Sequence, residues 1–186
     1  VQRLREECLR VGIRKPLVIS DSGVRAAGVL DRALAALGDT PHAVFDATPS
    51  NPTEAAVRAA AAVYTAQGCD GIVALGGGSE IDCAKGVAIA ATHPGPLKTY
   101  ATIEGGSPKI TDRVPPLIAV PTTAGTGSEV TVAAVVSDPE RQQKLVVMDL
   151  RVVPRMAALD PCLMTGLPPH ITAATGMDAL THAVEA

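Results

Sequence analysis

The stretch GIVALGGGSEIDCAK, residues Gly71–Lys85, decides the fold. Its first five residues form a continuous apolar run, which predicts a strand buried on both faces, and residues 79–91 predict an Ala-rich helix. Three glycines separate the two segments. They would let a ligand approach the backbone and the first N–H groups of the helix, which attract phosphate. The stretch matches neither GxxxxGK(S/T) nor GxGxxG, so a tight strand–helix turn that binds nothing stays open as the alternative.

The polar residues of this stretch predict how the helix begins. We interpret Ser79 as its N-cap, with Asp82 three residues later completing a capping box. Lys85 lies one turn into the helix, where a lysine is by default a solvated charge.

Strand and helix patterns alternate outward from this stretch. Three strand–helix units in succession predict a parallel sheet with helices on both faces, a Rossmann-like α/β fold. We expect strands at 16–20, 42–46, 71–75, 117–120 and 156–160, and helices at 24–38, 52–68 and 79–91. Residues 130–137 and 144–148 predict a strand pair joined by a polar turn, and Asn51 with Pro52 predicts the start of the second helix.

The character of the chain changes to helix from residue 161 onward, so residues 161–167 are the candidate domain boundary. We therefore expect an α/β domain at 1–163 and the incomplete start of a helical domain at 164–186. Val1 in place of Met and the absence of a helix stop signal near Ala186 favour a fragment of a longer protein.

Composition excludes several classes of function. The chain has 186 residues, of which 47% are hydrophobic and 2% aromatic, so it can build a core from Ala, Val, Leu and Ile and is not intrinsically disordered. A net charge of -3 without stacking aromatics argues against nucleic-acid binding. The longest apolar runs fall short of the roughly 20 residues that span a bilayer, which argues against a membrane partner.

The four cysteines, Cys8, Cys69, Cys83 and Cys162, are widely spaced, which excludes a CxxC motif. In a chain without a signal region they predict reduced, buried thiols and a cytoplasmic location, with one disulfide pair as the alternative.

Two further segments could bind a ligand at the sheet. Asp21 follows the first expected strand, where a carboxylate can accept hydrogen bonds from both ribose hydroxyls of adenosine, or simply cap a turn. The loop PTTAGTGSE, residues 121–129, could line a polar groove with hydroxyl and amide groups, or be an ordinary flexible loop.

Asp178 and His182 are four residues apart in GMDALTHAVEA, so they share one face of the expected last helix. A carboxylate oxygen and an imidazole nitrogen at this spacing suit one divalent metal ion, although a surface hydrogen-bonded pair is the alternative. A bound metal generally needs at least three protein ligands, and the sequence offers two convincing ones.

Taken together, GGGSEIDCAK, PTTAGTGSEVT, LDPCLMTGLPP and ATGMDALTHAVEA, in this order, resemble the N-terminal portion of the iron-containing, metal-dependent (group III) alcohol dehydrogenases. The resemblance covers essentially the whole chain. It implies a dinucleotide-binding α/β domain, followed by the first helices of an all-helical domain, with NAD(P) and a divalent metal in the cleft between the two. Iron is the expected metal, and zinc is the alternative.

The resemblance also implies roles for individual residues. Ten positions would serve the cofactor: Gly77, Gly78 and Ser79 on the pyrophosphate, Asp82 and Lys85 supporting that loop, Thr122 and Thr123 in the groove, Lys144 toward the ribose, and Asn51 and Asp21. An acid at Asp21 would repel a 2′-phosphate, so NAD is expected in preference to NADP. Asp178 and His182 match the first two metal ligands, and two further histidines are expected downstream.

The predicted function is hydride transfer between a small alcohol or aldehyde and NAD, with the metal as Lewis acid and without a catalytic residue beyond the metal ligands. We expect the isolated fragment to be inactive and the whole protein to form a homodimer. A stand-alone nucleotide-binding domain is one alternative. A glycerol dehydrogenase or maleylacetate reductase type of enzyme is another, although PTTAGTGSEVT argues against the first type and Asp178 against the second.

Overall fold

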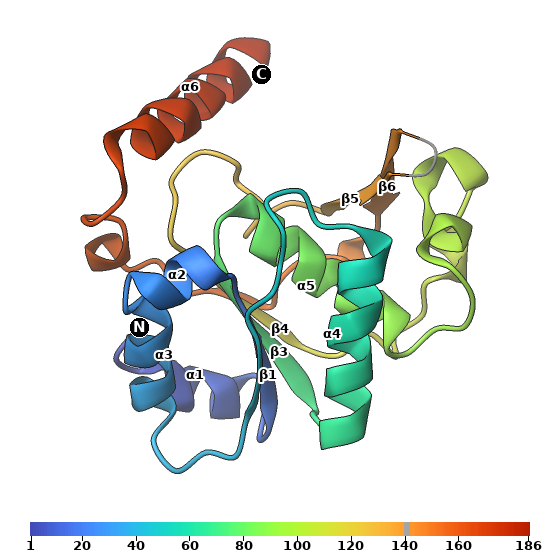
Figure 1. Ribbon diagram of the computed structural model, residues 1–186. Coiled ribbons are helices and arrows are strands. Elements are labelled where there is room, and N and C mark those ends of the chain that lie inside the picture. Colours follow the sequence, from blue (N-terminus) through green and yellow to red (C-terminus); the bar gives the residue numbers. More distant parts are fainter. Residues whose placement is uncertain (140–141) are drawn as a thin grey trace.

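Five parallel strands, in the order β2-β1-β3-β4-β7, form the central sheet of the computed structural model, which describes residues 1–139 and 142–186 (Figure 1). The strands are β1 (Pro16–Ile19), β2 (Ala43–Phe45), β3 (Gly71–Gly76), β4 (Leu117–Pro121) and β7 (Met156–Ala157). The predicted parallel sheet is confirmed, and β7 is shorter than the predicted strand at 156–160.

Helices cover both faces of this sheet (Figure 1). One face packs against α4 (Glu54–Gln67) and α5 (Gly78–Ala90), and the other packs against α1 (Leu4–Arg10) and α3 (Val29–Leu37). Successive side chains along a strand point to opposite faces, so a sheet covered on both sides requires continuous apolar strands. In β3, for example, Ile72 and Ala74 enter the first core and Val73 and Leu75 the second.

The predicted helix at 24–38 is two helices, α2 (Ser22–Ala26) and α3, because Gly28 has a φ of 71° and interrupts the helix with a left-handed residue. The prediction for the start of α4 was also wrong. Its N-cap is Thr53, whose hydroxyl accepts the Ala56 N–H at 3.2 Å, so Asn51 and Pro52 lie before the helix.

The predicted strand pair is confirmed as an antiparallel hairpin of β5 (Ala133–Asp138) and β6 (Gln143–Met148). Its predicted turn at 138–143 includes residues 140 and 141, which lie outside the described residues. The hairpin packs on α5, with Val136 and Val147 in the core beside that helix. Ser137 N–H donates to the carbonyl of Pro52 at 2.7 Å, which attaches the segment before α4 to the hairpin.

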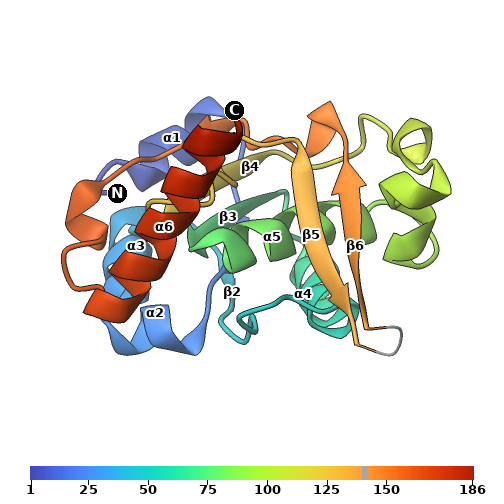
Figure 2. The same cartoon turned by 90° about the horizontal axis from the view of Figure 1, so that it is seen from above.

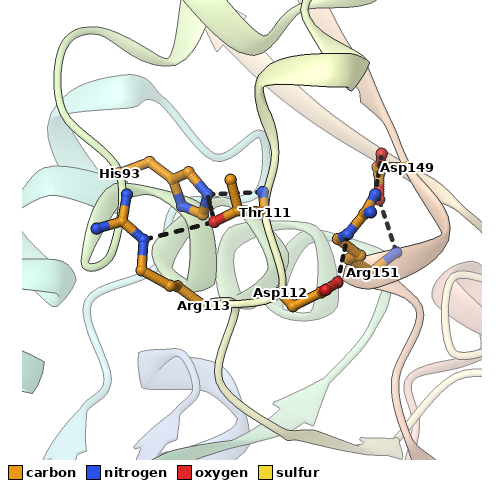
Figure 3. Close-up of polar contacts among 6 residues, drawn as sticks. All are labelled: His93, Thr111, Asp112, Arg113, Asp149 and Arg151. Atoms are coloured by element: carbon orange, nitrogen blue, oxygen red, sulfur yellow. Dashed lines mark hydrogen bonds and ion pairs between the residues drawn. The ribbon is translucent and has the colours of Figure 1, made fainter.

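The loop after α5 is fixed by polar contacts at its two ends (Figure 3). It contains the short 3-10 helices η1 (Leu97–Tyr100), η2 (Thr102–Glu104) and η3 (Ser107–Lys109), and η4 (Leu150–Val152) follows β6. His93 Nε2 accepts the Thr111 N–H at 2.9 Å, and Arg151 pairs with Asp112 at 2.7 Å and Asp149 at 3.2 Å. Burial lowers the pKa of His93, which favours the neutral ring that this hydrogen bond needs.

After the short helix η5 (Pro161–Leu163), α6 (Pro169–Glu185) extends beyond the rest of the molecule (Figure 1). Seen from above, it crosses over the region between α3 and α5 (Figure 2). None of the described residues of α6 is buried, and Met177, Leu180 and Val184 are exposed. The division into domains at 1–163 and 164–186 stays a prediction.

All four cysteines in the described part of the chain are free thiols. Cys8, Cys69 and Cys83 are buried as predicted, whereas Cys162 is exposed, because it lies in the short helix η5 at the surface. Across residues 1–139 and 142–186, none of the helices has the length and apolar character needed to cross a bilayer.

Gly71, the first residue of β3, provides a test of how tightly the sheet is packed. A Cβ at this position would overlap three side-chain atoms of the fully buried Ile13. We expect Gly71→Ala to lower the free energy of unfolding by about 2 kcal/mol through overpacking, measured by urea denaturation. Adding Ile13→Val should recover part of this loss, and a purely additive double variant would contradict the proposed contact.

Candidate functional site

The carboxyl ends of three neighbouring strands meet at one edge of the sheet. β1 leads to Asp21, β3 leads to Gly77, and β4 leads to Thr122. The chain passes from β1 to β2 on one side and then to β3 on the other, so the strand order changes direction between β1 and β3. In open parallel sheets, ligands bind in the crevice outside such a switch point.

The N-terminus of α5 lies at this switch point. Its N-cap is Gly77, and the N–H groups of Gly78 and Ser79 in the first turn have no acceptor within the helix. The predicted cap was wrong. The Ser79 hydroxyl donates to the Ser50 carbonyl at 2.6 Å, and Glu80 rather than Asp82 completes the cap by accepting the Gly77 N–H at 2.7 Å. The free donors and the positive end of the helix dipole can bind an anion.

Neighbouring side chains would crowd a Cβ at each position of the glycine run. A Cβ on Gly76 would overlap Glu80, and one on Gly78 would lie 2.8 Å from Thr126 Cγ2. On Gly77, a Cβ would lie 3.1 Å from Thr123 Oγ1. The glycines therefore allow the PTTAGTGSE loop to pack directly on the start of α5.

Asp82 and Lys85, both on α5, hold that loop in place. Asp82 accepts hydrogen bonds from the Ser128 hydroxyl at 2.5 Å and from the Val135 N–H at 3.1 Å. The Lys85 side chain is fully buried, and its ammonium donates to the carbonyls of Thr131 and Ala133 at 2.9 and 2.7 Å. The default expectation of a solvated lysine was therefore wrong.

Burial shifts the pKa values of both groups. It lowers the pKa of Lys85 to about 8, although Asp82 and Glu129 oppose this change. It also raises the pKa of Asp82, against the hydrogen bonds from Ser128 and Val135 and the positive charges of Lys85 and Lys144. The Lys85 ammonium lies 4.0 Å from Asp82, so the pair is held mainly through the loop atoms that both residues bind.

The structure brings two distant candidate residues together beside the crevice. Lys144 on β6 donates to the Asn51 side-chain oxygen at 3.1 Å, across 93 positions of sequence. The isolated bridge between Thr53 and Ser137, together with the Pro52 carbonyl contact, holds the Asn51 segment against the hairpin. Thr122 is buried, and its N–H donates to the Gly76 carbonyl at 2.9 Å.

Two cavities open side by side along this edge and share Gly77, Ser79, Glu80 and Thr123 as lining residues. Cavity A, of about 550 Å³, is also lined by Asn51, Gly78, Asp82, Lys144 and His182. Cavity B, of about 640 Å³, is also lined by Asp21, Arg32, Ser50 and Thr122. Each volume falls in the range of ligand pockets, about 300–1,000 Å³, so an extended ligand fits across the glycine run.

Asp21 has a structural role as well as a place in cavity B. It is the N-cap of α2, and its carboxylate accepts the Val24 N–H at 2.7 Å. The helix-cap alternative drawn from the sequence is therefore confirmed, and the contact with the ribose hydroxyls stays a prediction.

The predicted metal pair lies on α6. His182 Nε2 is 3.7 Å from Asp178 Oδ1, and both side chains are substantially exposed. The donor types suit a divalent ion, but no cluster of three or more potential ligands occurs within residues 1–139 and 142–186. His182 lines cavity A, so this face of α6 is directed toward the crevice.

Sequence reasoning missed Glu80. This residue is only 4% exposed, and it lines both cavities at the N-terminus of α5. Burial, followed by a hydrogen bond and charge repulsion from Asp21, raises its pKa to about 7. The available signal was an acid three residues after a glycine N-cap, the reciprocal half of a capping box.

The family follows from comparison with known proteins. Residues 1–161 match the family described as iron-containing alcohol dehydrogenase, and the chain belongs to this family. A curated relative, the 4-hydroxybutyrate dehydrogenase of Cupriavidus necator, is 58% identical over 185 residues, which are 100% of this chain and 48% of that protein. The chain thus spans about half the length of this relative.

Solved structures agree with this assignment. A 1,3-propanediol oxidoreductase superposes with a TM-score of 0.91 at 44% identity, over 98% of this chain and 47% of that chain. A sulfoacetaldehyde reductase from Bifidobacterium kashiwanohense, solved in complex with NAD+, superposes with a TM-score of 0.90 at 31% identity, over 99% and 48% of the two chains. The Rossmann-like fold predicted from the sequence is therefore confirmed.

Lys85 offers a test of the loop attachment. Lys85→Met would leave Asp82 and the carbonyls of Thr131 and Ala133 without their cation, so we expect a loss of about 3 kcal/mol in the free energy of unfolding. The matched control is Lys98→Met, which removes a half-exposed pair with Glu104 and should cost less than about 1 kcal/mol. Equal losses in urea denaturation would contradict the role given to Lys85.

Proposed function

We propose that this chain binds NAD across cavities A and B, and that it is the cofactor-binding part of a metal-dependent alcohol dehydrogenase. The observation that carries the proposal is the start of α5. Its first-turn N–H groups and Asp21 lie at the carboxyl ends of neighbouring strands, beside two joined cavities. The solved complex of a relative with NAD+ supports the choice of dinucleotide.

The residues present fit the parts of such a cofactor. The N–H groups of Gly78 and Ser79 would hold the pyrophosphate. Gly77 lines both cavities, and because it has no side chain the pyrophosphate could approach the backbone there. Asp21 would accept the ribose hydroxyls in cavity B. Thr122 and Thr123 would line the groove beside them.

Asn51 and Lys144 would contact the cofactor on the side of cavity A, where their mutual hydrogen bond positions the lysine ammonium. Asp82 and Lys85 would act indirectly, by holding the loop that carries Thr123 and Thr126. None of these side chains needs to react with the substrate.

Asp178 and His182 would supply two ligands to a divalent metal, iron first and zinc as the alternative. Bound NAD supplies the hydride acceptor, and the metal supplies a Lewis acid for the alcohol oxygen. Because the described residues offer only this pair, we propose that the chain by itself binds NAD without turning over an alcohol. This outcome matches the alternative of a nucleotide-binding domain without catalysis.

For the whole protein, we propose a short primary alcohol with a second polar group at its far end, or the corresponding aldehyde, as substrate. Two relatives, the 4-hydroxybutyrate dehydrogenase and the 1,3-propanediol oxidoreductase, are named for compounds of this kind. The cytoplasmic location and the homodimer stay predictions.

Asp21→Gly tests the cofactor preference. Glycine is tolerated at an N-cap, so α2 should persist, while loss of the carboxylate removes the repulsion of a 2′-phosphate and leaves Arg32 in the same cavity to attract it. We expect the affinity for NADP relative to NAD to rise about tenfold, or about 1.4 kcal/mol, in equilibrium titrations. Asp39→Gly, at an exposed site, is the control. An unchanged ratio in Asp21→Gly would disprove the ribose role.

His182→Ala tests the metal site in the longer protein that we propose. Loss of the imidazole should lower metal affinity by at least about tenfold, measured as bound iron or zinc per chain by elemental analysis. His170→Ala, at the start of the same helix, should keep full occupancy. If His182→Ala also kept full occupancy, Asp178 and His182 would be only a surface pair.

A further inference from the structure

Glu80 is the buried acid that the proposed cofactor contacts leave without a function. It projects from the first turn of α5, where Oε2 accepts the Gly77 N–H, and it lines both cavities that a dinucleotide would occupy. A carboxylate at this place has two opposing effects. It stabilises the helix N-terminus, but its negative charge lies beside the donors that would bind a pyrophosphate.

The surroundings of Glu80 favour the protonated acid. Its charged and titratable neighbours around the two cavities are Asp21 before α2, Arg32 on α3, Asp82 on α5, Lys144 on β6, Cys162 on η5 and His182 on α6. The Asp21 carboxylate lines cavity B together with Glu80, and after burial it is the neighbour that raises the pKa of Glu80. Two carboxylates that line one cavity repel each other, and a proton on one of them removes this repulsion.

We propose that Glu80 makes cofactor binding proton-linked: the chain binds the dinucleotide pyrophosphate with Glu80 protonated, and it takes up the proton from solvent when binding occurs at higher pH. In this form Oε2 still accepts the Gly77 N–H, and the protonated carboxyl group would not repel the pyrophosphate or the Asp21 carboxylate. Glu80 is thus a positioning residue for the N–H groups of α5. The inference rests on the proposed binding of NAD.

The direction of the pH dependence follows from the carboxyl group. Its pKa lies near 7 in the folded chain, against an ordinary value of 4.5. Without a ligand, the folded state therefore holds a proton that the unfolded state loses between these values, so this group makes the fold less stable as pH rises from 4.5 to about 7. A bound pyrophosphate adds negative charge and raises the pKa further, so its affinity must fall as pH rises above about 7.

Calorimetric titration of the 186-residue chain with NAD tests this inference. We expect the affinity to fall about tenfold between about pH 6.5 and about pH 8.5, and about half a proton to be taken up per NAD near pH 7, from titrations in buffers of different ionisation enthalpy. Neither measurement requires a variant.

Glu80→Gln keeps an acceptor for the Gly77 N–H, but it cannot titrate. It should bind NAD with little pH dependence and no proton uptake, and more tightly than the parent chain at about pH 8.5. Glu104→Gln, at a half-exposed site on η2, should behave like the parent chain. A parent chain that binds NAD equally across this range, or a Glu80→Gln variant that keeps the proton uptake, would overturn the role of Glu80 and leave the proposed function intact. A parent chain that binds no NAD at any pH would overturn both.

Discussion

The buried ammonium of Lys85 is the interaction on which the crevice depends. It joins the middle of α5 to the end of the PTTAGTGSE loop and to the start of β5, through the Ser128 hydroxyl and the carbonyls of Thr131 and Ala133. Because Lys85 holds the loop, Thr123 lies against Gly77 and Thr126 against Gly78. The hairpin is fixed by the same contacts, and its second strand carries Lys144 to Asn51.

Such an arrangement is stable only because every donor of the ammonium meets an acceptor. Moving an unpaired charge into the protein interior costs several kcal/mol, and an ion pair at 4.0 Å with Asp82 would not by itself offset that cost. The oriented carbonyls supply the remaining compensation, and they belong to residues that have to be held in place for the crevice to exist. The lysine thus links the stability of the fold to the shape of the site, and a smaller polar side chain could not reach from α5 to both carbonyls.

The predictability of this molecule from sequence differs between its apolar and its polar features. Continuous apolar runs such as 71–75 identified the parallel strands, because burial on both faces leaves a local signature that needs no knowledge of contacts. The predicted N-caps were wrong, because Ser79 and Asn51 are residue types that often cap helices. The packing of the loop decides in favour of Gly77 and Thr53. The environments of Lys85 and Glu80 depend on segments 40 or more residues away, and no local pattern contains that information.

The position of α6 relative to the carboxyl ends of the strands depends on one residue of the PTTAGTGSE loop, Gly125. A Cβ at this position would overlap the backbone carbonyl of Thr175, so the loop touches α6 directly. Thr175 and His182 both line cavity A, as do Gly77 and Gly78. The proposed hydride transfer would require the reacting atoms to approach to about 3–3.5 Å, so the separation between the proposed metal ligands and the proposed cofactor groove would have to be set within a fraction of that distance. Since α6 has no buried residue within the described chain, this backbone contact at Gly125 is a major constraint on that separation.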